Sequence, residues 1–170
     1  MLRILDHPGI MKLEGAYETE NTAYIALEFI PGMSLMKIFK KNKILTKNQI
    51  QVFMECLIKI LVYMSDMGIA HRDLKPDNIM LKNGCINDPV IIDFGLATHC
   101  NDYPYMLGKC GTPGYIPPEI YKNEKISPAC DIYSAGVIFY NLLTNLPLFS
   151  GHNEEEIKNK NIAGKYTLNM

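Results

Sequence analysis

Two short polar segments constrain this chain more than any other feature: HRDLKPDN at His71–Asn78 and DFG at Asp93–Gly95. An apolar stretch, Val90–Ile92, leads directly into Asp93, as a buried strand that ends at a cleft would do. Side-chain carboxylates and amides of this kind bind Mg²⁺, and a carboxylate also accepts protons. The two segments therefore predict a cleft that binds a metal ion and moves a proton.

The remaining sequence predicts one folded unit that contains both strands and helices. Strands are expected at Met11–Glu18, Thr22–Phe29, Ile79–Leu81 and Val90–Ile92. Helices are expected at Ser34–Lys41, from Thr46 to Gly68, at Asp131–Thr144 and at Asn153–Ala163. Thr46 and Gln49 form a capping-box pattern at the start of the second helix. Because Asp131–Thr144 is apolar on nearly all sides, we expect that helix to be buried on every face.

Composition narrows the class of protein. The net charge is −1, and only two of the 17 basic residues are arginine, so the chain is not expected to bind nucleic acid or a membrane surface. The five cysteines form no CxxC pair, which argues against a zinc site or a disulfide framework and favours a reducing compartment. No apolar stretch has the length of a membrane span. We therefore expect a cytoplasmic protein.

The segments HRDLKPDN, DFG and GTPGYIPPE, in this order, resemble those of eukaryotic protein kinases, and the resemblance covers essentially the whole chain. Lys75, two residues after Asp73, is typical of the serine/threonine branch, and the opening LDHPGIMKL resembles the calcium/calmodulin-dependent group. The family implies an α+β fold. Residues 1–30 would form a remnant of the N-terminal lobe, with two strands and the hinge. Residues 31–170 would form the mostly helical C-terminal lobe without its last helices.

The resemblance also implies an activity, the transfer of the γ-phosphoryl group of ATP to serine or threonine hydroxyls of protein substrates, with Mg²⁺ as cofactor. Asp73 would orient and deprotonate the substrate hydroxyl, and Lys75 would contact the transferred phosphoryl group of ATP. Thr112 would hydrogen-bond both of these side chains. Asn78 and Asp93 would bind the magnesium ion.

The same resemblance places the adenine ring of ATP. Leu27 falls at the gatekeeper position, and Glu28–Ile30 resembles the hinge between the lobes. There the backbone carbonyl of Glu28 and the backbone amide of Ile30 would pair with adenine, and Met80 would form the floor under the ring. For the apolar members of this set, ordinary core packing is an alternative interpretation that predicts nearly the same positions.

Several family features are expected outside these 170 residues. The glycine-rich loop, the strand lysine and the helix glutamate that grip ATP are expected upstream, and regulation of the calcium/calmodulin type is expected downstream. The polypeptide as written is therefore expected to have little or no kinase activity by itself. The usual activation-loop phosphosite corresponds to Gly108, which has no hydroxyl and cannot be phosphorylated. Thr98, Tyr103 and Tyr105 then remain as secondary phosphorylation sites.

Two other classes of function remain open at this point. A pseudokinase or scaffold would bind partners without catalysis, but the intact set of Asp73, Asn78 and Asp93 argues against it. A small-molecule kinase of related fold shares an aspartate followed five residues later by an asparagine. The GTPGY and PPE segments favour a protein substrate instead.

Overall fold

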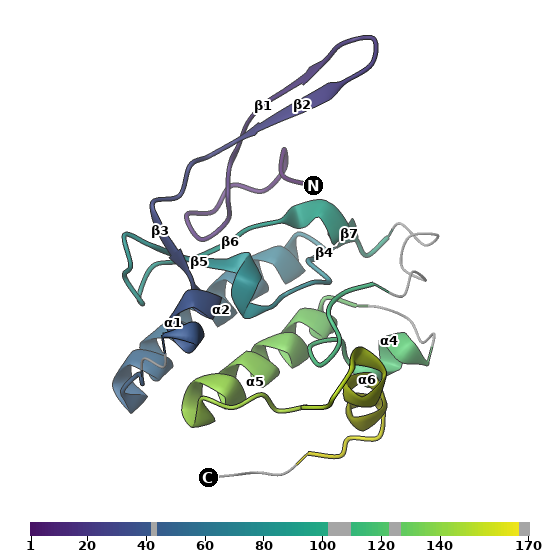
Figure 1. Ribbon diagram of the computed structural model, residues 1–170. Coiled ribbons are helices and arrows are strands. Elements are labelled where there is room, and N and C mark those ends of the chain that lie inside the picture. The colour runs from purple at the N-terminus through teal and green to yellow at the C-terminus, as the bar shows by residue number, and fades with distance from the viewer. Residues whose placement is uncertain (42–43, 102–109, 123–126, 167–170) are drawn as a thin grey trace.

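The computed structural model describes residues 1–41, 44–101, 110–122 and 127–166. It places a layer of short strands above a body of helices, with one hairpin projecting away from both (Figure 1). The predicted α+β class is therefore confirmed. Three positions of the predicted activation loop, Tyr103, Tyr105 and Gly108, lie outside the described residues.

The projecting hairpin consists of β1 (Leu13–Glu18) and β2 (Ala23–Leu27), which pair antiparallel. Both strands were predicted, and each is a few residues shorter than expected. The turn between them is closed by the backbone N–H of Thr19, which donates to the carbonyl oxygen of Thr22 at 2.8 Å. Every residue of β2 is exposed, because no third strand among the described residues joins this hairpin.

A second, three-stranded antiparallel sheet has the order β3-β5-β6. Its strands are β3 (Gly32–Ser34), β5 (Ile79–Lys82) and β6 (Pro89–Ile91). β5 and β6 were predicted, whereas β3 was not. A further short pair, β4 (Ile69–Ala70) with β7 (Thr98–His99), was also missed. Strands of two or three residues are too short to show an alternating pattern in the sequence.

The long helix α2 (Lys47–Asp66) begins at the predicted capping box. The hydroxyl oxygen of Thr46 accepts the backbone N–H of Gln49 at 3.2 Å, and the side chain of Gln49 accepts the backbone N–H of Thr46 at 2.9 Å. The helix ends just before Gly68, whose φ of +68° suits glycine. The buried face of α2 contributes Ile50, Phe53, Leu57, Ile60, Leu61 and Met64 to the core.

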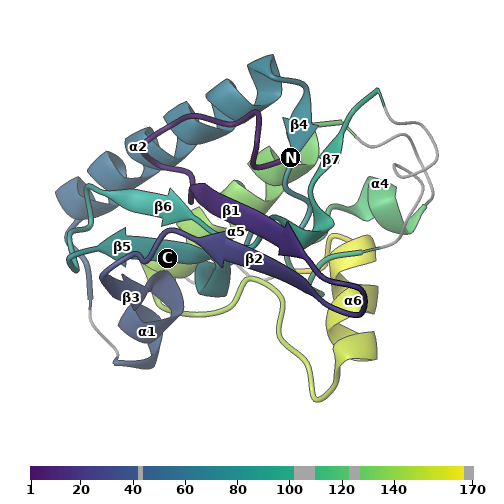
Figure 2. The same cartoon turned by 90° about the horizontal axis from the view of Figure 1, so that it is seen from above.

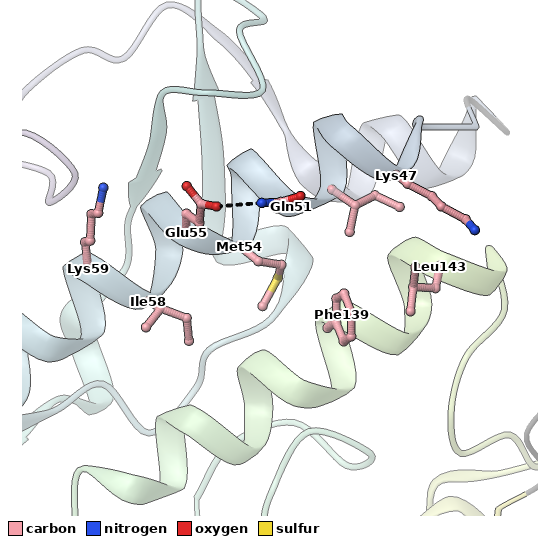
Figure 3. Close-up of a pocket in the computed structure, with 9 residues that line it drawn as sticks. Lys47, Gln51, Met54, Glu55, Ile58, Lys59, Phe139 and Leu143 are labelled. Carbon is pink, nitrogen blue, oxygen red and sulfur yellow. Dashed lines mark hydrogen bonds between the residues drawn. The ribbon is translucent and has the colours of Figure 1, made fainter.

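The helix α5 (Ala129–Thr144) packs against α2, but the prediction that it is buried on every face is wrong. Ile132, Phe139 and Leu143 are 46%, 42% and 47% exposed. Phe139 and Leu143 face the side of α2 across an apolar groove of about 670 Å³ (Figure 3). The sequence pattern correctly predicts that this face of α5 is apolar, but no described segment packs over it.

The other helices are short. They are α1 (Leu35–Lys40), α4 (Pro118–Tyr121) and α6 (Glu154–Ile162). Of two single 3₁₀ turns, Pro76–Asn78 ends the first segment singled out in the sequence, and Phe94–Leu96 begins in the second and extends one residue beyond it. α6 begins at Asn153, whose side chain accepts the backbone N–H of Glu156 at 2.9 Å. Among the described residues, no helix combines the length and apolar composition needed to cross a membrane.

Candidate active site

The His71–Asn78 loop runs between β4 and β5, and the first turn of α5 anchors its start. The carboxylate of Asp131 accepts the backbone N–H of His71 at 2.7 Å and that of Arg72 at 3.0 Å. Asp131 is only 2% exposed. Burial raises its pKa, and the nearby His71 with the two N–H donors acts in the opposite direction. This contact holds Arg72 at a φ of +71°, which is rare for a residue other than glycine.

Three predicted catalytic residues meet just beyond this anchor. The hydroxyl of Thr112 donates to Oδ1 of Asp73 at 2.7 Å. The ammonium group of Lys75 lies 2.8 Å from Oδ2 of Asp73 and donates to the hydroxyl oxygen of Thr112 at 2.7 Å. All three side chains therefore contact one another, and both carboxylate oxygens of Asp73 are held in place.

Asn78 joins this group from the end of the same loop. Its amide nitrogen donates to the backbone carbonyl of Asp73 at 2.9 Å and to Oδ2 of Asp73 at 3.1 Å. An amide has two N–H donors, so these contacts leave its carbonyl oxygen for another partner. No hydrogen bond to that oxygen is formed within the described part of the chain. Asn78 thus presents an oxygen of the type that Mg²⁺ prefers.

Asp93 is brought beside Asn78 through the backbone of the preceding residue. The N–H of Ile92 donates to the carbonyl oxygen of Asn78 at 2.9 Å, and the ring Nε2 of His71 lies 2.9 Å from the carbonyl oxygen of Ile92. Asp93 itself is exposed and adopts a left-handed backbone with φ of +61°. Its Oδ1 accepts the N–H of Gly95 at 3.3 Å. The carboxylate therefore projects from a fixed turn and is accessible to a ligand.

Asn78 and Asp93 together fit a magnesium ion that is bound with a nucleotide. Mg²⁺ keeps most of its coordination positions for water and phosphate oxygens, and typically takes only one or two protein carboxylates or amides. Consistent with this, the described residues contain no closed group of three or more His, Cys, Asp or Glu side chains that would hold a metal by themselves. The assignment of these two residues as ligands stays a prediction that the donor chemistry supports.

The ring of His71 also contacts the ring of Phe94 edge-on, with 4.9 Å between the ring centroids. His71 is fully buried, and its Nδ1 accepts the backbone N–H of Asp73 at 3.2 Å. One imidazole therefore supports both polar segments: it contacts the backbone of Asp73 on one side and the residues flanking Asp93 on the other.

The residues predicted to hold adenine lie where β2 leads into β3. Leu27 ends β2 and is 42% exposed. The N–H of Glu28 donates to the carbonyl oxygen of Lys12 at 2.9 Å, whereas the carbonyl of Glu28 and the N–H of Ile30 form no hydrogen bond with other described residues. Met80, in the middle of β5, is half-buried. These two backbone groups therefore have no hydrogen-bond partner among the described residues, and their pairing with adenine stays a prediction.

The side chain of Glu28 provides a contact that the sequence did not predict. Its Oε1 lies 3.4 Å from the ammonium group of Lys82 at the end of β5, and its Oε2 accepts the N–H of Lys12 at 3.4 Å. Glu28 therefore connects the segment before β3 to the three-stranded sheet through Lys82 and to the start of the β1-β2 hairpin through Lys12. Nothing in the sequence marks Lys82 as its partner, because the two residues are 54 positions apart.

Thr98 was considered a secondary phosphorylation site, and its position argues against that interpretation. It is 4% exposed and lies in β7, where it pairs with Ala70 of β4. A modifying enzyme cannot reach a hydroxyl at such a depth in this conformation. Thr98 is therefore a structural residue of the short β4-β7 pair.

Comparison with known proteins identifies the family. The model of the protein kinase domain matches residues 1–169. The chain belongs to the protein kinase family. This confirms the resemblance on which the sequence interpretation depended, and it agrees with the contacts that Asp73, Lys75 and Asn78 form.

Proteins with sequences similar to this chain are named as kinases. It is 40% identical to probable serine/threonine-protein kinase 2 of Plasmodium falciparum over 99% of this chain. It is also 40% identical to calcium-dependent protein kinase 6 of Plasmodium berghei over 93% of this chain, and 32% identical to a probable myosin light chain kinase of Dictyostelium discoideum over 98%. The chain spans 33%, 11% and 55% of these three relatives, respectively. The predicted division into lobes at residues 1–30 and 31–170 stays a prediction.

Proposed function

We propose that the protein is a cytoplasmic serine/threonine kinase that transfers the γ-phosphoryl group of ATP to hydroxyls of protein substrates. One observation carries the proposal: the carboxylate of Asp73 is held by Thr112, Lys75 and Asn78 at distances of 2.7 to 3.1 Å. A carboxylate, a cation and a metal-binding amide in direct contact are the groups that phosphoryl transfer requires. The low net charge and the absence of a CxxC pair support the cytoplasmic location.

Asp73 is suited to orient the substrate hydroxyl and accept its proton. Its side chain keeps 11% of its surface exposed, and both carboxylate oxygens are fixed by neighbours. Lys75 adds a positive charge next to the same group, where it would stabilise negative charge on the transferred phosphoryl group. Thr112 links the two side chains and keeps their separation constant. Most of the rate enhancement in such a site comes from this positioning.

Asn78 and Asp93 would hold the magnesium ion through their side-chain oxygens. When bound, the ion neutralises charge on the phosphate groups of ATP. The contribution of the chain itself is the fixed orientation of the two ligands. The amide of Asn78 is set by its two hydrogen bonds to Asp73, and the carboxylate of Asp93 by the turn that ends in Gly95.

Regulation by calcium is the finer part of the proposal, and it rests on the names of relatives. Several relatives are named calcium-dependent protein kinases. We propose that a calcium- or calmodulin-type element outside residues 1–170 controls this kinase. No observation in the described part of the chain favours the alternative of a pseudokinase or scaffold. Asp73, Asn78 and Asp93, the residues that a pseudokinase could lose, are all present.

The experiment is a phosphotransfer assay with the full-length protein, γ-labelled ATP, Mg²⁺ and a mixture of serine-, threonine- and tyrosine-containing peptides. We expect label on serine or threonine, loss of transfer on removal of Mg²⁺, and a decrease of at least about a thousandfold for Asp73→Asn. A wild-type rate equal to that of Asp73→Asn would contradict the proposal and favour the scaffold.

A further inference from the structure

We infer that Asn141, in the middle of α5, is a positioning residue for the proposed phosphoryl transfer, because through Tyr115 it fixes the segment that carries Thr112. This inference rests on the proposed function. Asn141 interrupts a helix that is otherwise apolar on nearly every side, and it is 6% exposed. A buried amide destabilises a protein unless its polar atoms are hydrogen-bonded, so its partners indicate why a polar residue is present there.

Both polar atoms of Asn141 bind groups outside its own helix. The amide nitrogen donates to the phenol oxygen of Tyr115 at 3.0 Å. The amide oxygen accepts the backbone N–H of Leu148 at 3.1 Å. Because a backbone N–H can only donate, the second contact fixes which end of the amide faces Tyr115. Asn141 therefore presents a donor to Tyr115 in a defined direction.

Tyr115 transmits this contact to the catalytic residues through its backbone. Its N–H donates to the carbonyl oxygen of Thr112 at 3.0 Å, which closes a turn between the two residues. The hydroxyl of Thr112 then reaches Oδ1 of Asp73 at 2.7 Å. A displacement of Tyr115 would thus move Thr112, and with it the contact between Asp73 and Lys75.

The main chain of this segment is held at two further points, separate from the hydrogen bond between Asn141 and the phenol oxygen of Tyr115. Ser134 of α5 donates its hydroxyl to the backbone carbonyl of Tyr115 at 2.8 Å. Asn161 of α6 donates to the backbone carbonyl of Ile116 at 2.7 Å. These two bonds fix the main chain. The bond from Asn141 orients the phenol oxygen of a ring that also packs against the hydrophobic core.

The phenol oxygen lies in an environment where a neutral hydroxyl is favoured. Burial raises the pKa of Tyr115 to about 12, and the charge of Asp77 acts in the same direction, while the bond from Asn141 acts in the opposite one. Asp77 belongs to the same loop as Asp73. The hydroxyl of Tyr115 therefore contacts α5 through Asn141 and lies within electrostatic range of the catalytic loop through Asp77.

A purely structural role for Asn141 makes a different prediction from a positioning role. Leucine has the same number of side-chain heavy atoms and the same branching as asparagine and would suit an apolar helix, so it removes the polar contacts while keeping the outline of the side chain. Tyr115→Phe removes only the hydroxyl from the other partner and guards against misfolding of the first variant. Thr144→Ala is the matched control, because among the described residues its hydroxyl bonds only to Tyr140 and Leu146, near the end of the same helix.

The experiment measures kcat and the KM for ATP of the full-length protein and these variants. We expect Asn141→Leu and Tyr115→Phe each to lower kcat by about tenfold, with the KM for ATP unchanged within about twofold, and Thr144→Ala to match the wild type. The double variant Asn141→Leu/Tyr115→Phe should be no slower than Asn141→Leu alone, because Tyr115→Phe removes a bond that Asn141→Leu has already removed. Additive losses, or an equal loss in Thr144→Ala, would overturn the inference.

A second readout does not depend on activity. Hydrogen–deuterium exchange of backbone amides in residues 111–117 should become faster in Asn141→Leu and Tyr115→Phe and stay unchanged in Thr144→Ala. If the wild type transfers no phosphate, the proposed function fails, whereas faster exchange in these variants would still support the positioning contact. Unchanged exchange in both variants would overturn it.

Discussion

Thr112 and Asp73 are 39 positions apart in the sequence, and the hydroxyl of Thr112 donates to the carboxylate of Asp73 at 2.7 Å. The same hydroxyl accepts from Lys75 at 2.7 Å. A single side chain from the segment after DFG thus sets the distance between the proposed base and the proposed phosphate-binding cation. Because threonine has one hydroxyl that both donates and accepts, neither contact can be kept by a side chain without that group.

Thr112→Val should therefore lower kcat strongly, because valine keeps the shape and removes both contacts. We expect a decrease of about 10- to 100-fold with little change in the KM for ATP. Thr112→Ser, which keeps the hydroxyl, should stay within about threefold of the wild type. Steady-state kinetics of the full-length protein provide the measurement, and equal rates for the serine and valine variants would show that the hydroxyl is not the relevant group.

Asn78→Ala should change the dependence on magnesium. Removing the amide oxygen removes one proposed ligand, so the Mg²⁺ concentration for half-maximal activity is expected to rise by at least about tenfold. Asn87→Ala is a suitable control, because Asn87 is exposed in the turn between β5 and β6, and within the described part of the chain only its backbone carbonyl has a hydrogen-bond partner. An unchanged magnesium titration for Asn78→Ala would argue against its role as a ligand.

Gly32→Ala should destabilise the protein more than a comparable change at Gly84. Gly32 has a φ of +137°, and an added Cβ would lie 2.0 Å from the backbone oxygen of Leu81. Gly84 also has a positive φ, +73°, but an added Cβ would meet nothing within 4 Å. We expect a loss of about 3 kcal/mol or more in the free energy of unfolding for Gly32→Ala and about 1 kcal/mol for Gly84→Ala. Urea denaturation gives both values, and similar losses would contradict the close approach of β3 to β5.

The pKa of Tyr115 predicts how stability depends on alkaline pH. Burial raises this pKa to about 12 from its ordinary value of 10.0. Between these two pH values the folded protein keeps the phenol proton while the unfolded chain loses it. The stabilisation is therefore present below pH 10 and is lost as the pH rises towards 12. The free energy of unfolding of the wild type should fall by about 2 kcal/mol more than that of Tyr115→Phe over this interval.

Chemical denaturation at a series of pH values from about 10 to about 12 checks this difference. The comparison uses the slope with pH, so the constant effect of losing the hydrogen bond to Asn141 cancels. Tyr24→Phe serves as the control, because Tyr24 is 57% exposed on the projecting hairpin. Parallel slopes for the wild type and Tyr115→Phe would show that the phenol titrates equally in both states.

Local sequence patterns predicted those parts of the fold that depend on nearby residues. The capping box at Thr46, the two strands of the hairpin and the end of α2 before Gly68 are all determined within a few positions. Asp73, Lys75 and Asn78 were predictable for the same reason, since one loop and one 3₁₀ turn bring them together.

Contacts between distant segments could not be predicted in this way. The bond from Asn141 to Tyr115 and the ion pair between Glu28 and Lys82 join positions whose spacing has no local signal. The exposed face of α5 was missed for a related reason. An apolar residue such as Phe139 shows that burial is favourable, but the sequence does not show which neighbour provides it. The placement of Thr112 depended on the family resemblance alone.

The anchoring of the catalytic loop by Asp131 also has a consequence for synthesis on the ribosome. His71 precedes Asp131 by 60 residues, and the buried N–H groups of His71 and Arg72 have this carboxylate as their acceptor. At translation rates of about 5–20 residues per second, that interval corresponds to about 3–12 s. During this time the nascent chain contains the loop without its anchor, so the local arrangement around Asp73 is expected to mature only after α5 has emerged.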